Sequence, residues 1–283
     1  MRSTADPDLA RLRFVLTRPS HPGNIGAAAR ALRTMGFERL ALVAPARFPD
    51  PEATALAAGA DAVLATAALH ATLPDALADC TLALGLSARR RGVSLPELDP
   101  RAAAAVVWTA LRRGETVALV FGNERTGLEN NELARCHTMV RIPSIDDFSS
   151  LNLAQAVQVM AYELRMATLA TPAPITTIAS ESSESPAAGA DMERFFEHLF
   201  AALDAIDFHK GRAPITIEKR LRKLFLRAKP DARELRVLHG ILSDAERMAR
   251  LAGRDAAAAA SEQSPQQGQD RAAGTGEGAD GGQ

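Results

Sequence analysis

Residues 117–169 constrain the fold of this 283-residue chain more than any other stretch. Residues 117–121 (VALVF) form a short apolar run with β-branched and aromatic members, which is typical of a strand buried on both faces. The loop that follows, GNERTG, is bracketed by Gly122 and Gly127, which allow the backbone to turn tightly and to approach a ligand closely. The loop is therefore either a ligand-binding loop or a plain turn.

A second short strand and a long helix are expected after that loop. Ser149 or Ser150 stands where the N-cap of the helix should be. The apolar residues that follow fall on one helical face: Leu151, Ala154, Val157, Ala161 and Leu164. Exposed backbone N–H groups at the start of such a helix can hold a polar ligand.

The first half of the chain alternates between strand-like and helix-like segments. Asn24 should cap a helix that ends at Gly36, and residues 101–112 should form another helix. The expected strands are residues 13–16, 40–43, 62–64, 81–84 and 117–121. This alternation predicts an α/β fold in which helices cover a parallel sheet.

The composition changes after residue 170, where Pro, Ser and Thr become frequent and apolar periodicity is lost, as in a linker. The end of the chain has too little apolar surface to order itself. The predicted organisation is a first domain (1–170), a linker (171–191), a small all-α C-terminal module (192–253) and a disordered tail (254–283). Within the module, helices are expected over residues 192–206, 216–227 and 232–251.

Composition and motifs exclude several classes of protein. The chain carries a formal charge of −1 and two cysteines, Cys80 and Cys136, which have no metal-ligand spacing. It has no Walker loop and no apolar run long enough to cross a bilayer. Its first residues lack the basic start and the apolar core of a signal peptide. We therefore expect a cytoplasmic protein without a metal site.

Three basic segments stand out against this neutral average. Arg30 and Arg33 lie about one turn apart on the helix expected after Asn24. Arg89 and Arg91 follow the strand at 81–84, on the side of the sheet where ligands gather in open α/β folds. Between residues 209 and 236, ten Lys and Arg face three acidic residues. The most crowded group there is Lys219, Arg220, Arg222 and Lys223. These charges either solubilise the surface or contact phosphates.

Three motifs together resemble the SpoU branch of the SPOUT RNA methyltransferases. They are Asn24-x-Gly26-x-x-x-Arg30, the loop from Gly122 to Gly127, and Ser150-Leu-Asn152. The resemblance covers residues 17–169 and the helical module to about residue 251. It implies a parallel α/β sheet whose C-terminal segment is threaded into a trefoil knot, and a homodimer. It also implies 2′-O-methylation of tRNA, at the cytidine or uridine at position 32 of the anticodon loop.

The same resemblance implies roles for individual residues. S-adenosylmethionine is expected to bind in the knotted loops. The implied cofactor-binding residues are Leu86, Ser87, Ala88, Gly122, Ile142, Ser149, Ser150, Leu151 and Asn152. The implied catalytic residues are Arg30, which would face the cofactor of the other subunit, and Asn24 and Ser150, which would orient the ribose. The expected RNA contacts are Arg33, Arg89, Arg91, Lys219, Arg220, Arg222 and Lys223.

Two alternatives remain open for the function. One is a 2′-O-methyltransferase for ribosomal RNA or for another tRNA position, and the other is an RNA-binding protein that keeps the fold without catalysis. To act as the base, an arginine would need its pKa lowered from about 13 to about 8, which costs roughly 7 kcal/mol. We therefore expect Arg30 to act as a cation that stabilises the developing alkoxide and grips phosphate. The proton acceptor stays unassigned.

Overall fold

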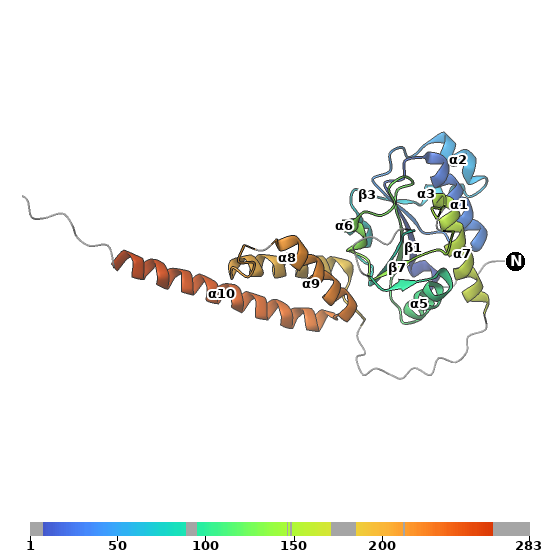
Figure 1. Ribbon diagram of the computed structural model, residues 1–283. Helices are drawn as coiled ribbons and strands as arrows, with labels where there is room; N and C mark the ends of the chain where they lie inside the picture. Colours follow the sequence, from blue (N-terminus) through green and yellow to red (C-terminus); the bar gives the residue numbers. More distant parts are fainter. Residues whose placement is uncertain are drawn as a thin grey trace, which may run out of the picture.

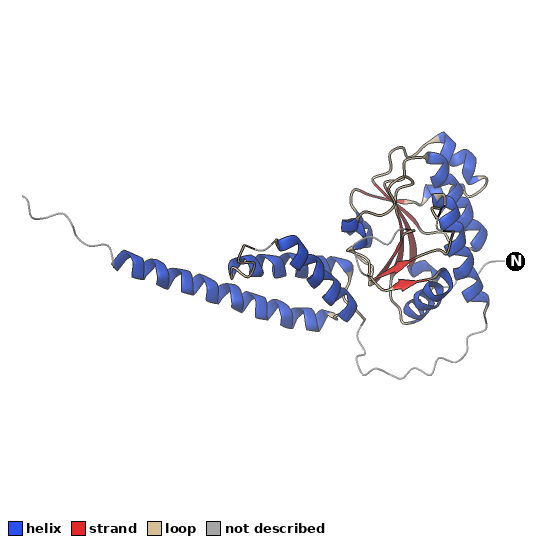
Figure 2. Ribbon diagram, viewed as in Figure 1, coloured by secondary structure: helices blue, strands red, loops and turns tan. Residues whose placement is uncertain are grey.

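The computed structural model describes residues 8–88, 95–145, 147, 149–170, 185–211 and 213–262. Its centre is a seven-stranded sheet in the order β3-β2-β1-β6-β4-β7-β5, in which each neighbouring pair is parallel (Figures 1 and 2). The strands are β1 (Leu12–Thr17), β2 (Leu40–Val43), β3 (Ala68–His70), β4 (Leu82–Leu86), β5 (Glu97–Leu98), β6 (Val117–Phe121) and β7 (Thr138–Val140). The predicted α/β class with a parallel sheet is confirmed.

Helices cover both faces of this sheet, because alternate residues of its strands point to opposite sides. Phe14 and Leu16 belong to the apolar core beneath α1, α5 and α7, whereas Val15 belongs to the core beneath α4 and α6. Figure 1 shows α1, α5 and α7 on one side of the strands and α6 on the other. The helices of this domain are α1 (Pro22–Met35), α2 (Pro51–Ala57), α3 (Asp61–Ala65), α4 (Leu73–Leu77), α5 (Pro100–Arg112), α6 (Asn130–Leu133) and α7 (Leu153–Leu169), with a 3-10 turn, η1, at Leu9–Arg11.

One predicted strand is wrong. Residues 62–64 lie in helix α3, where Val63 and Leu64 are buried, and the strand of this region, β3, comes later in the chain. A run of three apolar residues cannot distinguish a strand from one buried turn of helix. The true strand lies at the edge of the sheet, and two of its three residues are exposed, so it carries no apolar signal.

Helix α1 begins earlier than predicted, and Asn24 does not cap it. The N-cap residue is His21, which makes no side-chain capping bond, and Pro22 opens the first turn, where its missing N–H is harmless. The predicted end is confirmed, since Gly36 adopts the left-handed conformation with φ of 86°. Gly26 permits close packing of α1 on α2, because a Cβ at this position would lie 2.0 Å from the carbonyl oxygen of Ala53.

The three helices expected after the linker are present as α8 (Gly189–Ala205), α9 (Pro214–Ala228) and α10 (Ala232–Glu262). They enclose a small apolar core of their own, centred on Phe195 and Phe196. Helix α10 continues past residue 254 into the segment expected to be a tail, because the alanines there are strong helix formers even without an apolar partner. Linker residues 171–184 and tail residues 263–283 lie outside the described residues.

The helical module contacts the sheet domain at the start of α8. The Gly189 N–H donates to the carbonyl of Cys80 (2.9 Å), and a Cβ on Gly189 would lie 2.4 Å from the carbonyl oxygen of Leu77. Helix α8 therefore begins within the last residues of the predicted linker.

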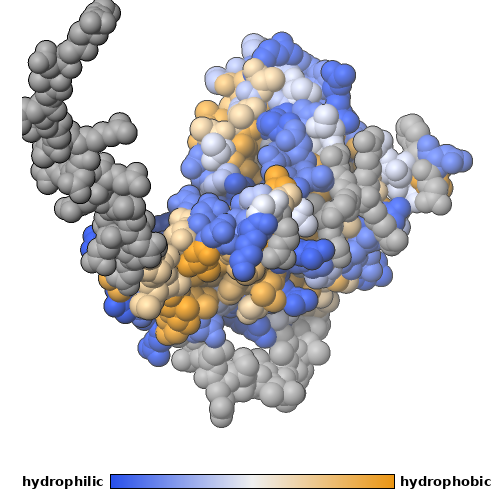
Figure 3. Space-filling model, turned by 60° about the vertical axis from the view of Figure 1, so that its left-hand side comes forward, coloured by the Kyte–Doolittle hydropathy of each residue, from blue (hydrophilic) through white to orange (hydrophobic). Residues whose placement is uncertain are grey.

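On the face shown in Figure 3, apolar patches appear among hydrophilic residues. The exposed large apolar residues of α10 are Val237, Ile241, Met248 and Leu251.

A three-member ion cluster adds to this contact. The Arg222 guanidinium makes two hydrogen bonds of 2.8 Å to the Glu193 carboxylate, and Arg135 of the sheet domain donates to the same carboxylate at 2.7 Å. Arg222 also lies over the Phe196 ring, 4.4 Å from its centroid. Burial raises the pKa of Glu193, but the two guanidinium groups outweigh it and lower the pKa below its usual value. Arg222 is therefore engaged within the protein.

We expect His137 to make the stability of the chain depend on pH. Its imidazole accepts the Ala83 N–H through Nδ1 (3.1 Å), and burial, aided by the charge of Lys229, lowers its pKa to about 4. Between pH 6.5 and pH 4 the unfolded chain binds a proton that the folded chain does not, so stability is retained above pH 6.5 and falls with pH. We expect a loss of about 3 kcal/mol by pH 4 from this group.

Denaturant unfolding at several pH values measures this effect, with His137→Asn as the comparison. The Asn side chain keeps an acceptor for the Ala83 N–H and does not titrate. The variant should lose most of the pH dependence between pH 6.5 and pH 4. An identical dependence in both proteins would contradict the assignment.

Candidate active site

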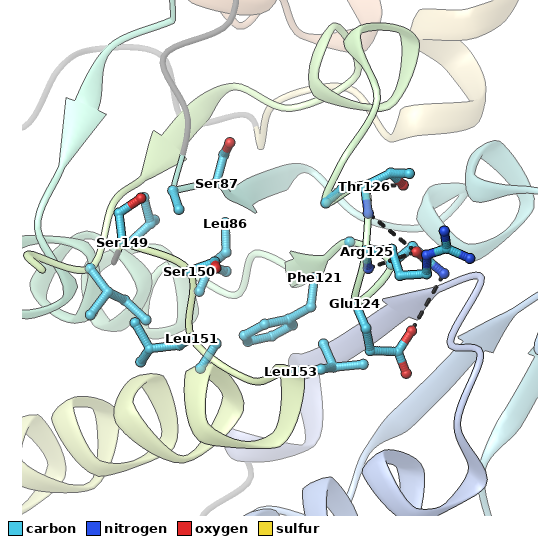
Figure 4. A pocket seen from close by; sticks show the side chains of 17 residues that line it. Leu86, Ser87, Phe121, Glu124, Arg125, Thr126, Ser149, Ser150, Leu151 and Leu153 are labelled. Carbon is cyan, nitrogen blue, oxygen red and sulfur yellow. Dashed lines mark hydrogen bonds between the residues drawn. The ribbon is translucent and has the colours of Figure 1, made fainter. Parts of the chain in front are cut away.

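A pocket opens at the carboxyl ends of β4, β6 and β7, which are neighbours in the sheet (Figure 4). Ligands of open α/β sheets bind at this edge. The lining residues come from four segments of the chain: residues 86–88, 121–127, 140 and 142, and 149–156. The pocket therefore joins loops that are far apart in the sequence.

Most of the predicted cofactor-binding residues meet in this pocket. Its lining includes Leu86, Ser87, Ala88, Gly122, Ile142, Ser149, Ser150 and Leu151. Asn152 follows directly in the chain and caps helix α7 instead. The predicted RNA contacts Arg89 and Arg91 lie outside the described residues.

The loop after β6 is held in one shape by its own residues. A Cβ on Gly122 would lie 2.1 Å from backbone atoms of Gly127 and Leu128, so only glycine fits there. The Asn123 side chain accepts the Arg125 N–H (2.9 Å) through Oδ1 and donates to the carbonyl of Arg18 (2.7 Å) through Nδ2. Of the two interpretations of this loop, the structure favours a binding loop, because all six of its residues line the pocket.

Glu124, for which the sequence predicts no role, organises the site. Its carboxylate accepts the Ser20 N–H (2.9 Å), the Ser20 hydroxyl (2.8 Å), the His21 N–H (3.1 Å) and the Asn24 amide (3.0 Å). Partial burial raises the pKa of Glu124, but these hydrogen bonds outweigh it and hold the pKa at about 2. The glutamate therefore stays ionised and fixes the β1–α1 loop against the β6–α6 loop.

Asn24 connects this carboxylate to the third motif. While its Nδ2 donates to Glu124, its Oδ1 accepts the Asn152 amide at 2.9 Å. One residue from each of the three motifs thus lies in a single hydrogen-bonded row, Glu124–Asn24–Asn152. This network explains why Asn24 does not cap α1.

The predicted N-cap of α7 is wrong. Asn152 caps the helix, accepting the Ala154 N–H at 2.9 Å, and Gln155 reaches back to the Asn152 N–H to complete a capping box. The Asn152–Gln155 spacing was the signal for this start. The capping role leaves Ser149 and Ser150 in the lining of the pocket.

Two of the three predicted catalytic residues, and the described residues predicted to contact RNA, do not line this pocket. Arg30 is exposed on α1, and Asn24 reaches the pocket only through Glu124, so Ser150 alone of the predicted catalytic residues lines it. Arg33 forms an ion pair with Glu38. On α9, Lys219 and Arg220 are exposed and Lys223 is half-buried.

The described residues were also compared with the requirements of a metal site, a reactive thiol and a membrane span. Within them, no three His, Cys, Asp or Glu side chains form a group that could hold a metal ion. Cys80 and Cys136 are buried, and burial raises the pKa of each thiol to about 12. No described helix is long and apolar enough to span a membrane.

Comparisons with known proteins give the family. Residues 11–162 match the model of the SpoU rRNA Methylase family, and residues 190–254 match that of the C-terminal domain of the tRNA methyltransferase TrmJ. The first match alone spans more than half of the chain. The chain therefore belongs to the SpoU methylase family.

Individual relatives contain both parts of the chain. The tRNA (cytidine/uridine-2′-O-)-methyltransferase TrmJ of Citrobacter koseri is 47% identical over 84% of this chain and 97% of its own length. The protein of the same name from Escherichia coli K12 is 46% identical over 84% and 96%. The crystal structure of TrmJ from Z. mobilis has a TM-score of 0.72 at 35% identity, covering 83% of this chain and 98% of that one. Within the family, the chain is of the TrmJ type.

Glu124→Gln tests the network. A glutamine cannot accept all the donors that surround the carboxylate, so the variant should be less stable at pH 7 by about 1 kcal/mol, a modest figure because the site is partly exposed. The contribution of the lowered pKa is present above about pH 4.5 and is lost as pH falls toward 2. The difference in unfolding free energy should therefore shrink with falling pH. Equal stability at pH 7 would contradict the network.

Proposed function

We propose that the protein transfers a methyl group from S-adenosylmethionine to the ribose 2′-hydroxyl of a tRNA nucleotide. The observation that carries the proposal is the meeting of the three motifs around one pocket, through Glu124, Asn24 and Asn152. The names of the relatives support the reaction and the tRNA substrate. The TrmJ-type helical module supports tRNA over ribosomal RNA.

The pocket fits the proposed cofactor. Apolar side chains of Leu86, Ile142 and Leu151 line it beside the hydroxyls of Ser149 and Ser150. Gly122 lets the loop close tightly beside the pocket, since a Cβ there would collide with the backbone of Gly127 and Leu128. The cofactor would supply an electrophilic methyl group, and the protein would hold the 2′-oxygen in line with it. We also propose that the segment after β7 is threaded through the neighbouring loops as a trefoil knot.

Arg30, Asn24 and Ser150 would act on the ribose rather than on the cofactor. Because Arg30 is exposed and absent from the pocket of its own chain, we propose that a homodimer brings it to the pocket of the partner. There its charge would stabilise the alkoxide that develops on the 2′-oxygen. Ser150 lies in the pocket lining, where it could orient the ribose. Asn24 would help to orient the ribose from the start of α1, which its hydrogen bonds to Glu124 and Asn152 hold in place.

We propose the pyrimidine at position 32 of the anticodon loop as the methylated nucleotide, on the strength of the TrmJ-type module. The test is to incubate the purified protein with S-adenosylmethionine and unmodified tRNA and then to map the 2′-O-methyl groups along the tRNA. A single modification at position 32 is expected. Methylation elsewhere in tRNA or in ribosomal RNA would support the alternative substrates, and cofactor binding without methylation would leave a non-catalytic RNA-binding protein.

Arg30→Ala should abolish methyl transfer while leaving cofactor affinity within a few fold of wild type. The reason is that Arg30 does not line the pocket of its own chain and is assigned to the ribose or phosphate. Turnover on tRNA and calorimetric titration with S-adenosylmethionine measure the two effects. Loss of cofactor affinity in a folded variant would show that the role is misassigned.

The basic residues of α9 divide into two groups with different expected effects. Lys219→Gln, Arg220→Gln and Lys223→Gln together should weaken tRNA binding and reduce the log–log salt slope by about 0.7–0.9 for each phosphate that is no longer neutralised. Arg222→Gln should instead lower the melting temperature, because it leaves Glu193 with a single guanidinium partner. tRNA affinity from low to moderate salt, with melting curves for both proteins, separates the groups. An unchanged salt slope in the triple variant would end the tRNA-contact proposal for these residues.

A further inference from the structure

Arg125 is a cation at the rim of the pocket. It belongs to the loop after β6, lines the pocket, and is exposed. Figure 4 shows it at the opposite edge of the pocket from Ser149 and Ser150. Its backbone N–H is fixed by Asn123 Oδ1 at 2.9 Å, so the base of the long side chain has a defined position.

The neighbouring carboxylate does not occupy this guanidinium. Glu124 is satisfied by neutral donors, namely the Ser20 N–H and hydroxyl, the His21 N–H and the Asn24 amide. Within the described part of the chain, no carboxylate pairs with Arg125. The charge next to the pocket is therefore available to a ligand.

Two other described arginines near the pocket loops are paired with carboxylates. Arg18, on the adjoining β1–α1 loop, pairs with Glu129 (2.7 Å) and Glu132 (3.0 Å). Arg141, one residue past β7, lies 3.9 Å from a carboxylate oxygen of Glu97. Of these three described arginines, Arg18 and Arg141 are paired with carboxylates and Arg125 at the rim of the pocket is not.

The charge of the two proposed ligands decides which one Arg125 fits. S-adenosylmethionine carries one carboxylate against an ammonium and a sulfonium, so a guanidinium gains little from its net positive charge. An RNA strand carries one negative charge per phosphate, and the guanidinium fork matches phosphate oxygens in a bidentate manner. Because it stands at the solvent edge, the side chain also faces the side from which a polynucleotide must enter.

We propose that Arg125 binds a backbone phosphate beside the nucleotide whose ribose enters the pocket. The contact anchors the RNA strand at the rim, so that the 2′-oxygen is presented to the interior. This inference rests on the proposed function, because it takes RNA as the substrate. Arg125 is on this account an RNA-binding residue, and it does not take part in proton transfer.

The test compares three variants: Arg125→Gln, which removes the charge, Arg125→Lys, which keeps it, and the control Arg101→Gln. Arg101 is an exposed arginine on α5 that pairs with Glu163 (3.2 Å) and does not line the pocket. tRNA affinity is measured from low to moderate salt in the presence of S-adenosylhomocysteine, so that no turnover occurs. Cofactor affinity and melting temperature are measured on the same proteins.

Arg125→Gln should raise the Kd for tRNA several-fold and reduce the log–log salt slope by about 0.7–0.9, the value for one phosphate contact. Arg125→Lys should restore most of the salt slope, because a point charge suffices for counterion release, while recovering only part of the affinity. Cofactor affinity and melting temperature should stay at the wild-type value in all three proteins. Arg101→Gln should match wild type throughout.

Two results would overturn the proposal. One is a wild-type Kd and salt slope in Arg125→Gln, and the other is a loss of cofactor affinity, which would place the guanidinium on the cofactor carboxylate. The proposed function fails separately, if the wild-type protein binds tRNA but transfers no methyl group. The binding assay with S-adenosylhomocysteine does not depend on turnover, so the two failures are distinguishable.

Discussion

The site depends on one partly buried charge, the Glu124 carboxylate. A charge that is partly removed from water must be met by donors, and here they come from a loop that is about a hundred residues away in the sequence. By drawing in Ser20, His21 and Asn24, the carboxylate fixes the start of α1 against the β6–α6 loop. Asn24 also accepts a hydrogen bond from Asn152, which caps α7, so the start of α7 is held in the same network. These hydrogen bonds hold the loops around the pocket in one arrangement, as catalysis by positioning requires.

The sequence predicted the parallel sheet and most of the pocket, but it did not predict what holds the pocket together. Buried strands such as residues 117–121 can be recognised by their continuous apolar runs. Gly122 can be recognised by its position directly after such a run. The role of Glu124 depends on partners supplied by folding, so no local pattern shows it. Asn24 looked like an N-cap because its residue type favours capping, and a tertiary contact overrode that preference. The edge strand β3 was missed because its exposed residues carry no apolar signal.

The positive side chains fall into two groups: some pair with carboxylates within the protein, and others are left available to a ligand. Arg222 resembled its neighbours on α9 in sequence, yet the structure pairs it with Glu193 beneath the aromatic core of the module. Lys219 and Arg220 remain exposed on the same helix. Around the pocket, Arg18 is paired while Arg125 is left available. Counting positive residues along the chain therefore overstates the surface available to RNA, and only the pairing pattern separates the two groups.

The central claim is that Glu124 and Asn24 act as one unit, and a double-mutant cycle tests it most directly. The unfolding free energy would be measured at pH 7 for wild type, Asn24→Ala, Glu124→Ala and the double variant. Two residues in one hydrogen-bonded network should show a coupling energy of about 0.5–3 kcal/mol, the double variant losing less stability than the sum of the single variants. A coupling energy of zero within error would contradict the account, since each residue would then act without the other.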